Sequence, residues 1–439
     1  MNQKRKTVIK NQIKKALIPK PVREKRAKKR VLESVKAQIA DIGVLDKQLL
    51  CGEDLEALEA GYRNLTAGRD GISVHFLFNL ALGAFVQTFI IAKKNGADRD
   101  NKIHLMVPAA MDAQTGEVRL PNPCVSEYFD FLFLPDKENI KLYLYILNYH
   151  LDDIDLSTWS SFAPGSIEAD GAYDAYEDYR GFEALCYTEE EKQTGAKYLR
   201  SIGVTGPYVS FRNRVAKGGS LGGVRNGDTS TYYKAVDYLQ KQGIQCVYVG
   251  LNENENELGN GIIDASKQYD AKMDLYIHSQ AEFFMGDHSG IISFAQMFNR
   301  PMILLNLPYF TMNGDAYGPT FYERDILLPE KIYDTKNKRY LTIREMLNFE
   351  MTYLEYKDLV KFYIDNGYIF EKNTEDEIEE AVKEMLAKIS GTFKYSEEDL
   401  ALQKKYLRIM QNNAVKYRAK WCRAAIGMEF LRNNRWLLD

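Results

Sequence analysis

The chain has 439 residues, of which 45% are hydrophobic and 27% charged, and this composition excludes disordered and collagen-like classes. Its net charge of -3 hides an asymmetry: residues 1–43 carry 14 Lys and Arg against three Asp and Glu, a net +11. The remainder carries 44 against 58, a net -14. The length predicts two or three domains, and the acidic body is unsuited to wrapping nucleic acid.

The five cysteines stand singly, without CxxC spacing, and the five histidines form no HExxH or HxxxH pair. These patterns argue against a disulfide framework and against a histidine-built metal site. We therefore predict a reducing, cytoplasmic location, with no bound metal and no cofactor.

Residues 1–45 form a separate basic segment, in which the clusters Lys4–Lys6 and Lys25–Arg30 flank apolar residues at helical spacing. One interpretation is a solvated tail. The other is a segment over residues 1–43 that docks on an anionic membrane surface, which would place the protein on the inner face of the membrane. Nucleic acid is a weaker third partner, since no aromatic residue interleaves the charges. No apolar stretch typical of a secretory signal follows the first basic residues.

The next segment, residues 71–92, contains no Asp, Glu, Lys or Arg and is long enough to cross a bilayer. However, His75, Asn79 and Gln87 interrupt it, and each is costly in hydrocarbon. A strand over residues 72–76 followed by a buried helix over residues 78–94 explains the same pattern without that cost. We favour this second interpretation.

Alternating short apolar runs and helical patterns continue along the chain. The capping box Thr188–Glu191 begins one helix, and Thr374 with Glu377 begins another. Strands separated by helices indicate βαβ units with parallel sheets and helices on both faces. We predict one α/β domain over 46–190, a second α/β domain over 191–395 and a basic helix over 396–439. The predicted strands are 103–107, 207–212, 245–250, 261–265, 282–285 and 301–306.

Two strand ends in the second predicted domain carry groups suited to an anion. The strand over 207–212 ends in Arg212 and Arg214, and a Gly-rich loop over 217–228 follows, with Arg225 near its end. Arginine at the carboxyl edge of a parallel sheet gives a permanently charged, bidentate clamp for phosphate. The loop contains neither a Walker A motif nor GxGxxG, which disfavours an ATPase and a simple dehydrogenase.

The second strand end is the run Gly286–Gly290, with His288 and Ser289, before a predicted helix that ends at Phe298. Backbone N–H groups at Ser289 and Gly290, the hydroxyl and the helix dipole would converge there on an anion. Together with Arg212, this turn predicts a diphosphate site.

The run from Tyr208 to Tyr309 resembles the glycosyltransferases found in bacterial O-antigen and capsule gene clusters. It is also distantly similar to the nucleotide-binding half of fucosyltransferase-like GT-B enzymes. The family strand usually has a His two residues before its arginine, and here that position is Ser210. The matching pieces are 208–214 (YVSFRNR), 225–233 (RNGDTSTYY), Ala235, Leu239, 261–265 (GIIDA), 273–275 (MDL), 283–286 (FFMG), 289–290 (SG), 298–301 (FNRP), 306–308 (NLP), 373–378 (NTEDEI) and 384–386 (EML).

This resemblance implies a GT-B fold, in which two Rossmann-like domains face a cleft, with helical termini. It implies that the domain over 46–190 is the acceptor-side domain and that the domain over 191–395 binds the donor nucleotide sugar. It implies transfer of a sugar from a nucleotide-sugar donor to a surface glycan, lipid-linked or free. We expect Arg212 to clamp the diphosphate with Ser289 and Gly290, without a metal. The secondary donor-binding candidates are Arg214, Arg225, Asp264, His288 and Asn306.

An inverting transferase also needs a general base from the first domain. His75 and Asp112 follow predicted strands there and are the candidates. Two alternatives remain open from the sequence: a non-catalytic membrane-surface scaffold with a degenerate nucleotide fold, and a GT-B-like sugar-nucleotide epimerase.

Overall fold

The computed structural model divides into two compact units, residues 1–176 and 177–439, and each is described by itself. The structure describes residues 33, 36–37, 40, 43–76, 82–94, 96–108, 110–112, 114–118, 122–128, 131–151, 181–214, 224–251, 258–259, 261–310, 323–353, 356–413 and 423–439. Most of the predicted tail over 1–45 and most of the Gly-rich loop over 217–228 lie outside these residues.

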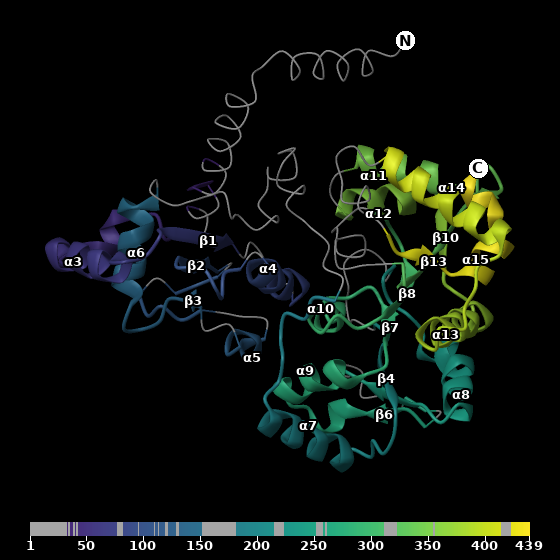
Figure 1. Cartoon of the computed structure of the whole chain (residues 1–439). Coiled ribbons are helices and arrows are strands. Elements are labelled where there is room, and N and C mark those ends of the chain that lie inside the picture. The colour runs from purple at the N-terminus through teal and green to yellow at the C-terminus, as the bar shows by residue number, and fades with distance from the viewer. Residues whose placement is uncertain are drawn as a thin grey trace, which may run out of the picture. The chain divides into compact units, whose positions relative to one another are not determined.

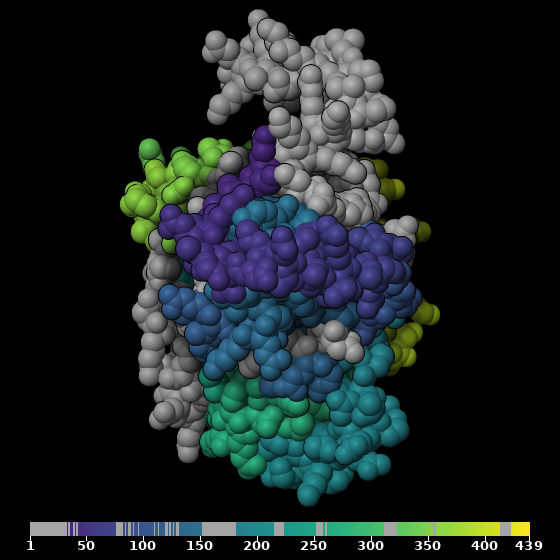
Figure 2. Space-filling model, turned by 90° about the vertical axis from the view of Figure 1, so that its left-hand side faces the viewer, coloured from purple at the N-terminus to yellow at the C-terminus, as the bar shows by residue number. Residues whose placement is uncertain are grey.

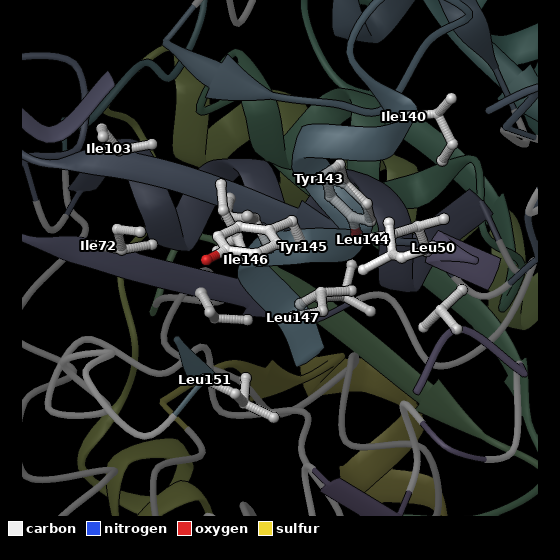
Figure 3. Packing of buried hydrophobic residues seen from close by; sticks show 14 residues of the cluster. Leu50, Ile72, Ile103, Ile140, Tyr143, Leu144, Tyr145, Ile146, Leu147 and Leu151 are labelled. Atoms are coloured by element: carbon white, nitrogen blue, oxygen red, sulfur yellow. The ribbon is translucent and has the colours of Figure 1, made fainter. Parts of the chain in front are cut away.

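The first unit contains a parallel sheet in the order β1 (Ile72–Phe76), β2 (Ile103–Val107) and β3 (Leu132–Phe133). Alternate residues of β1 and β2 pack against α6 (Ile140–Tyr149) in one apolar core. The labelled side chains from both strands and from α6 gather there in Figure 3. Further helices of this unit, in the described range 43–151, are η1 (Lys47–Leu50), α3 (Leu55–Thr66), α4 (Leu82–Lys94) and α5 (Pro123–Ser126).

Helix α3 lies on the outside of the first unit, where its purple atoms form part of the surface in Figure 2. None of its residues is buried, although Leu58, Tyr62 and Leu65 pack partly against the core. Its start is set by Asp54, whose carboxylate accepts hydrogen bonds from the N–H groups of Glu56 and Ala57. This amphipathic helix therefore covers the core while leaving a charged face outward.

The second unit is built on a seven-stranded parallel sheet in the order β13–β9–β8–β7–β4–β5–β6. From β4 the chain adds β5 and β6 on one side, then returns to add β7, β8, β9 and β13 on the other. This is the Rossmann strand order, with one additional edge strand. The strands are β4 (Tyr208–Arg212), β5 (Gln245–Tyr248), β6 (Ile263–Asp264), β7 (Phe284–Asp287), β8 (Met302–Leu307), β9 (Ile326–Pro329) and β13 (Ala425–Ile426).

Helices cover both faces of this sheet, with α7, α9 and α10 on one side and α8, α13 and α15 on the other in Figure 1. Capping boxes at Thr188, Thr342 and Thr374 begin α7, α11 and α13. A small antiparallel sheet, β11–β10–β12, accompanies the main one. The remaining elements are α7 (Glu189–Ser201), η5 (Thr229–Tyr232), α8 (Tyr233–Lys241), η6 (Ala265–Gln268), α9 (Ala271–Gln280), α10 (Ile292–Met297), β10 (Lys331–Asp334), β11 (Arg339–Tyr340), α11 (Ile343–Thr352), α12 (Tyr356–Asp365), β12 (Tyr368–Glu371), α13 (Glu375–Ile389), α14 (Glu397–Asn413), α15 (Met428–Asn433) and η9 (Arg435–Leu438).

The α/β class and the parallel sheets are confirmed. The apolar segment over 71–92 is interrupted as predicted, with β1 ending at Phe76 and α4 beginning at Leu82. None of the helices in the described ranges is long and apolar enough to cross a membrane. The segment is therefore a strand and a helix, not one span.

Two predictions about segment boundaries need correction. Residues 396–439 do not form one basic helix: α14 ends at Asn413, and Ala425–Ile426 pair with β9 as the edge strand β13. Buried Ile426 and Leu431 explain why this basic stretch enters the core. The second unit also begins before residue 191, since the N–H of Ala184 donates to the carbonyl of Met297 and Tyr187 stacks on Phe298.

Candidate functional site

The direction in which strands are added reverses between β4 and β7, which makes this the switch point of the sheet. The chain first adds β5 and β6 beside β4, and then adds β7 and the later strands on the other side. Arg212, the last residue of β4, is in register with Gly286 of β7. A Cβ on Gly286 would lie 2.0 Å from the backbone oxygen of Arg212, so only glycine fits there. Ligands of open parallel sheets bind outside the carboxyl ends of the strands at this point. The two strand ends selected from the sequence are therefore neighbours.

The side chain of Arg212 is hydrogen-bonded to the backbone that follows β5. Its Nη1 atom donates to the carbonyl oxygens of Val249 at 3.1 Å and Leu251 at 2.7 Å, and the guanidinium lies 5.0 Å from the ring centroid of Tyr248. Asp274 accepts from the N–H of Gly250 at 2.7 Å in the same turn. Burial raises the pKa of Asp274 to about 6, against the opposing effects of the Gly250 N–H and Arg212. No hydrogen bond joins Arg212 to Ser289 or Gly290 within the described residues.

The carboxylate of Asp287, the last residue of β7, accepts three hydrogen bonds from residues around the switch point. Its Oδ1 accepts from the Tyr232 hydroxyl at 2.5 Å and from Asn306 Nδ2 at 2.7 Å, and its Oδ2 accepts from the Arg214 N–H at 2.9 Å. The N–H of Gly227 donates in turn to the Arg214 carbonyl at 2.8 Å. Arg214 before the loop and Tyr232 after it are therefore both hydrogen-bonded to the last residue of β7, and Gly227 is hydrogen-bonded to Arg214.

Asn306 is part of the scaffold beneath the site. It exchanges hydrogen bonds with Asn373, from its backbone N–H to Asn373 Oδ1 at 2.7 Å and from the Asn373 N–H to its Oδ1 at 2.8 Å. Its side-chain oxygen and nitrogen therefore both have protein partners, and the residue is 2% exposed. Its backbone has a φ of 51°, which the paired amides hold in place.

Arg225 reaches His288, just after β7. Its Nη2 donates to the His288 carbonyl at 2.8 Å and lies 3.4 Å from His288 Nδ1, and the Tyr309 hydroxyl lies 3.2 Å from the same Nδ1. Because a guanidinium only donates, His288 Nδ1 is the acceptor and Nε2 carries the ring hydrogen. Burial, Arg225 and Arg214 lower the pKa of His288, so the ring is neutral.

Two buried donors at this place lack an acceptor among the described residues. They are the Ser289 hydroxyl and Arg225 Nε, which are enclosed by the protein. A buried donor left unpaired costs about 1–3 kcal/mol, and such groups call for an explanation such as an absent ligand. We call Arg225, His288 and Ser289 the donor cluster.

The helix predicted to follow Gly290 and to end at Phe298 is shorter than expected. Helix α10 begins at Ile292, has Ile291 as its N-cap and is six residues long. Ser289 and Gly290 lie in the preceding turn, where their carbonyls accept from the N–H groups of Ile292 and Ser293. A helix dipole thus contributes less here than the sequence pattern suggested, and the charge comes from arginine.

The other predicted site residues lie elsewhere. Asp264 caps η6 at the end of the edge strand β6, where its Oδ1 accepts from Ser266 N–H and Oγ. In the first unit, Asp112 closes a turn by accepting from the N–H groups of Gln114 and Thr115, and these bonds lower its pKa. His75 is buried in β1 and hydrogen-bonded to His104 at 2.8 Å.

Several contacts of the site could not be predicted from any motif in the sequence. Lys372 donates to the carbonyl of Val224, next to Arg225, and to the buried carboxylate of Glu330. Tyr309 contacts His288 across the start of the next loop. These partners are 21 to 148 residues apart in the chain, and only the sheet brings them together.

No group of three or more His, Cys, Asp and Glu side chains suited to a metal ion occurs among the described residues. No protein-family model matches the chain, and no curated protein matches it in sequence.

Solved structures resemble it at low similarity. A family 9 glycosyl transferase from Veillonella parvula is 14% identical, with 72% of this chain and 97% of that one covered at a TM-score of 0.43. The Escherichia coli ADP-heptose LPS heptosyltransferase II is 13% identical, with 53% and 84% covered at 0.32. A putative UDP-N-acetylglucosamine 2-epimerase from Listeria monocytogenes is 13% identical, with 78% and 80% covered at 0.23. We assign the fold of the second unit from its strand order and not from these similarities.

Proposed function

We propose that this protein is a GT-B glycosyltransferase that moves a sugar from a nucleotide-sugar donor to a surface glycan, lipid-linked or free. One observation carries the proposal. At the switch point of a Rossmann-ordered sheet, the buried Ser289 hydroxyl and Arg225 Nε lack acceptors. The oxygens of a diphosphate are acceptors that match both donors.

The reaction builds negative charge on the departing diphosphate, and fixed donors at that point lower the barrier. In this proposal Arg225, the Nε2–H of neutral His288 and the Ser289 hydroxyl contact the phosphate oxygens. Arg212 supplies a second charge, with its Nη1 committed to the β5 carbonyls. This assignment shifts the main clamp from Arg212 to Arg225, because Arg225 hydrogen-bonds to His288 after β7 whereas no hydrogen bond joins Arg212 to Ser289 or Gly290 among the described residues.

A thermal-shift panel of GDP, UDP, CMP and dTDP tests the donor site. A nucleotide present at 100 times its dissociation constant adds about 2.7 kcal/mol to stability. We expect one nucleoside diphosphate to raise the melting temperature of the wild-type protein. No shift with any diphosphate contradicts the proposal.

Product analysis with the matching nucleotide sugar then separates the enzyme classes. A transferase releases free nucleotide slowly, with water as the acceptor, whereas an epimerase returns a nucleotide with a changed sugar. A scaffold does neither. In this proposal the chain's own cations replace a metal, so EDTA leaves the nucleotide release unchanged, and restoration of lost activity by added Mg²⁺ would contradict that part.

The basic segment suits an acceptor held at a membrane. Residues 1–43 carry a net +11, and each Lys or Arg near an anionic surface contributes about 1 kcal/mol. We place the protein in the cytoplasm, peripheral on the inner face of the membrane. Deletion of residues 1–30 is expected to abolish binding to vesicles that contain anionic lipid. Undiminished binding would exclude the tail as the docking segment.

A further inference from the structure

Lys372 reaches the donor cluster from a distant part of the chain. It directly follows β12, and its Nζ donates to the carbonyl oxygen of Val224 and to Oε1 of Glu330, the latter at 2.5 Å. Val224 is the residue before Arg225, near the end of the Gly-rich loop. Glu330 is the residue after β9. One ammonium group therefore joins the backbone beside Arg225 to the carboxyl edge of the main sheet.

The backbone that carries Lys372 and Glu330 is fixed to that edge. The next residue, Asn373, exchanges two hydrogen bonds with Asn306 of β8, each from a backbone N–H to the side-chain oxygen of the other. Its Nδ2 also donates to the carbonyl of the last residue of β9 at 3.1 Å. The N–H of Glu330 donates to the carbonyl of the last residue of β8 at 2.9 Å. Lys372 and Glu330 are therefore both anchored at the ends of β8 and β9.

The carboxyl group of Glu330 is enclosed by the protein. The residue is 1% exposed, and its Oε2 has no hydrogen-bond partner among the described residues. Burial raises the pKa of Glu330 to about 8 against the opposing charge and hydrogen bond of Lys372, and Asp287 of β7 adds to the shift. Lys331, the next residue, is paired instead with Glu377 at 2.8 Å. At pH 7 Glu330 is therefore mostly neutral, and the pair that it forms with Lys372 carries one positive charge.

The segment 224–227, which contains Arg225, is held at both of its ends. At one end Lys372 binds the first carbonyl, and at the other the Gly227 N–H donates to the Arg214 carbonyl at 2.8 Å. Between them, the Arg225 side chain donates to the carbonyl that follows β7 at 2.8 Å. The backbone of Arg225 is thus placed before a ligand binds. A donor that is ordered in advance binds more tightly, because its ordering no longer opposes binding.

We propose that Lys372 is a positioning residue of the donor cluster, which holds Arg225 in its binding geometry by tying the Val224 carbonyl to Glu330. The assignment rests on the proposed function, in which Arg225 contacts the diphosphate. Lys372 acts through the backbone beside Arg225 and is not itself a catalytic residue. A donor held in place in this way needs no reorganisation when negative charge develops on the leaving diphosphate.

Hydrogen exchange followed by mass spectrometry tests this tie without any ligand. Lys372→Met removes the ammonium group and keeps an unbranched apolar side chain. We expect faster exchange in a peptide over 224–232 of this variant, where the Gly227 N–H is a reporter, and unchanged exchange in peptides over β4 and β8. Wild-type exchange over 224–232 in the folded variant would show that Lys372 does not hold this segment.

A second variant and a matched control separate this tie from general stability. Lys372→Met leaves the Glu330 carboxyl buried without its donor, so the double variant with Glu330→Leu is needed as well. Replacement of a buried ion pair by apolar side chains is often neutral for stability. Lys331→Met is the control, because it removes the ammonium group that joins β10 to Glu377 of α13. We expect faster exchange over 224–232 in the double variant and wild-type exchange there in Lys331→Met.

Calorimetry with UDP and with GDP tests whether Lys372 acts through Arg225. Ordering of one long side chain opposes binding by roughly two- to tenfold, so Lys372→Met and the double variant are expected to lose affinity by that factor. Lys331→Met should bind as the wild-type protein does. In the Arg225→Ala background, Lys372→Met should cause no further loss, because the two changes remove the same interaction. Losses that simply add would contradict the positioning role.

The pH dependence of this affinity is a readout that a purely structural role does not change. As the pH rises through 8, Glu330 ionises and its pair with Lys372 loses the net positive charge. The charge of the diphosphate is constant there, since its last ionisation lies near pH 6. We expect the wild-type affinity to fall severalfold between about pH 7 and 9. Glu330→Gln keeps an acceptor for Lys372 but cannot ionise, so its affinity should not fall; an equal fall in both proteins would exclude this charge effect.

The two proposals can fail separately. If the wild-type protein binds no nucleoside diphosphate, the proposed function falls and the binding role of Lys372 falls with it. Hydrogen exchange still decides whether Lys372 holds the segment 224–227. If the wild-type protein binds a diphosphate and Lys372→Met binds it equally well, the positioning role alone is wrong.

Discussion

The carboxyl ends of the two parallel sheets both contain buried polar atoms without a hydrogen-bond partner among the described residues, and the second unit holds donors as well as the acceptor Asn213 Oδ1. In the second unit, the residues after β7 and the loop end at Arg225 present buried donors without acceptors. In the first unit, the end of β1 presents a buried acceptor, His75 Nδ1, without a donor. Unpaired donors favour an anion and an unpaired acceptor favours a hydroxyl, so the two sheet ends are suited to different chemical groups.

The largest expected effect is on the fold beneath the donor cluster. Gly286→Ala places a methyl group 2.0 Å from the Arg212 oxygen, and β4 and β7 must separate. Overpacking of this kind costs about 1–3 kcal/mol or more. We expect the free energy of unfolding in urea to fall by about 3 kcal/mol. Gly206→Ala, where no atom lies within 4 Å of the new methyl group, is the control.

Arg225→Ala tests the charge of the donor cluster. Loss of a charged hydrogen bond costs about 1.5–3 kcal/mol, so affinity for the nucleoside diphosphate should fall roughly ten- to a hundredfold in calorimetry. Arg339→Ala removes a surface arginine paired with Glu345 in the same unit and should leave affinity unchanged. Equal affinities for the wild-type protein and Arg225→Ala would assign the diphosphate to another place.

The pH dependence of stability tests the protonation state of Glu330. Its partner Lys372 also donates to the carbonyl of Val224, next to Arg225. Burial raises the pKa of Glu330 to about 8, although Lys372 opposes the shift and Asp287 adds to it. The folded protein therefore keeps a proton that the unfolded chain releases above its ordinary pKa. This stabilisation is complete below that ordinary pKa and is lost as the pH rises towards 8.

Between pH 6.5 and 8, we expect the free energy of unfolding to fall by at most about 1.4 kcal/mol per pH unit on account of this group. Glu330→Gln should flatten the slope. The same slope in both proteins would show that Glu330 is ionised throughout. Near pH 6.5 the buried neutral histidines oppose this slope, because unfolded histidine still binds protons there, so the difference between the wild-type protein and Glu330→Gln isolates the Glu330 contribution.

The smallest effect is expected for Ser289→Ala, which should lower the affinity for the ligand without lowering the stability of the fold. The Ser289 hydroxyl has no partner in the protein, so Ser289→Ala should leave the melting temperature unchanged or slightly raised. Affinity for the diphosphate should fall by about 0.5–1.5 kcal/mol. Ser279→Ala is the opposite control, because the Ser279 hydroxyl donates to the Tyr276 carbonyl at 2.7 Å and its loss affects stability alone. A stability loss in Ser289→Ala would contradict an unpaired hydroxyl.

Much of the local structure was predictable from the sequence. The strand over 103–107 and the capping boxes at Thr188 and Thr374 occur where the patterns place them. The alternation of strands and helices also placed Arg212 and Ser289 at strand ends. The role of each arginine was not predictable, since Arg212 is engaged by carbonyls of β5 and Arg225 by His288. A side chain's partner depends on which strands become neighbours.

The sequence by itself determined the parallel α/β class and the places where cationic and hydroxyl side chains leave the strands, because periodicity, capping and turn chemistry act over a few residues. Only the tertiary structure decided that β13 closes the sheet edge, that Asp287 ties both sides of the Arg225 loop, and that Asp100 and His104 form one hydrogen-bond chain with His75. Those contacts join residues far apart in the chain, and they form only when burial brings polar groups together and removes water as their alternative partner.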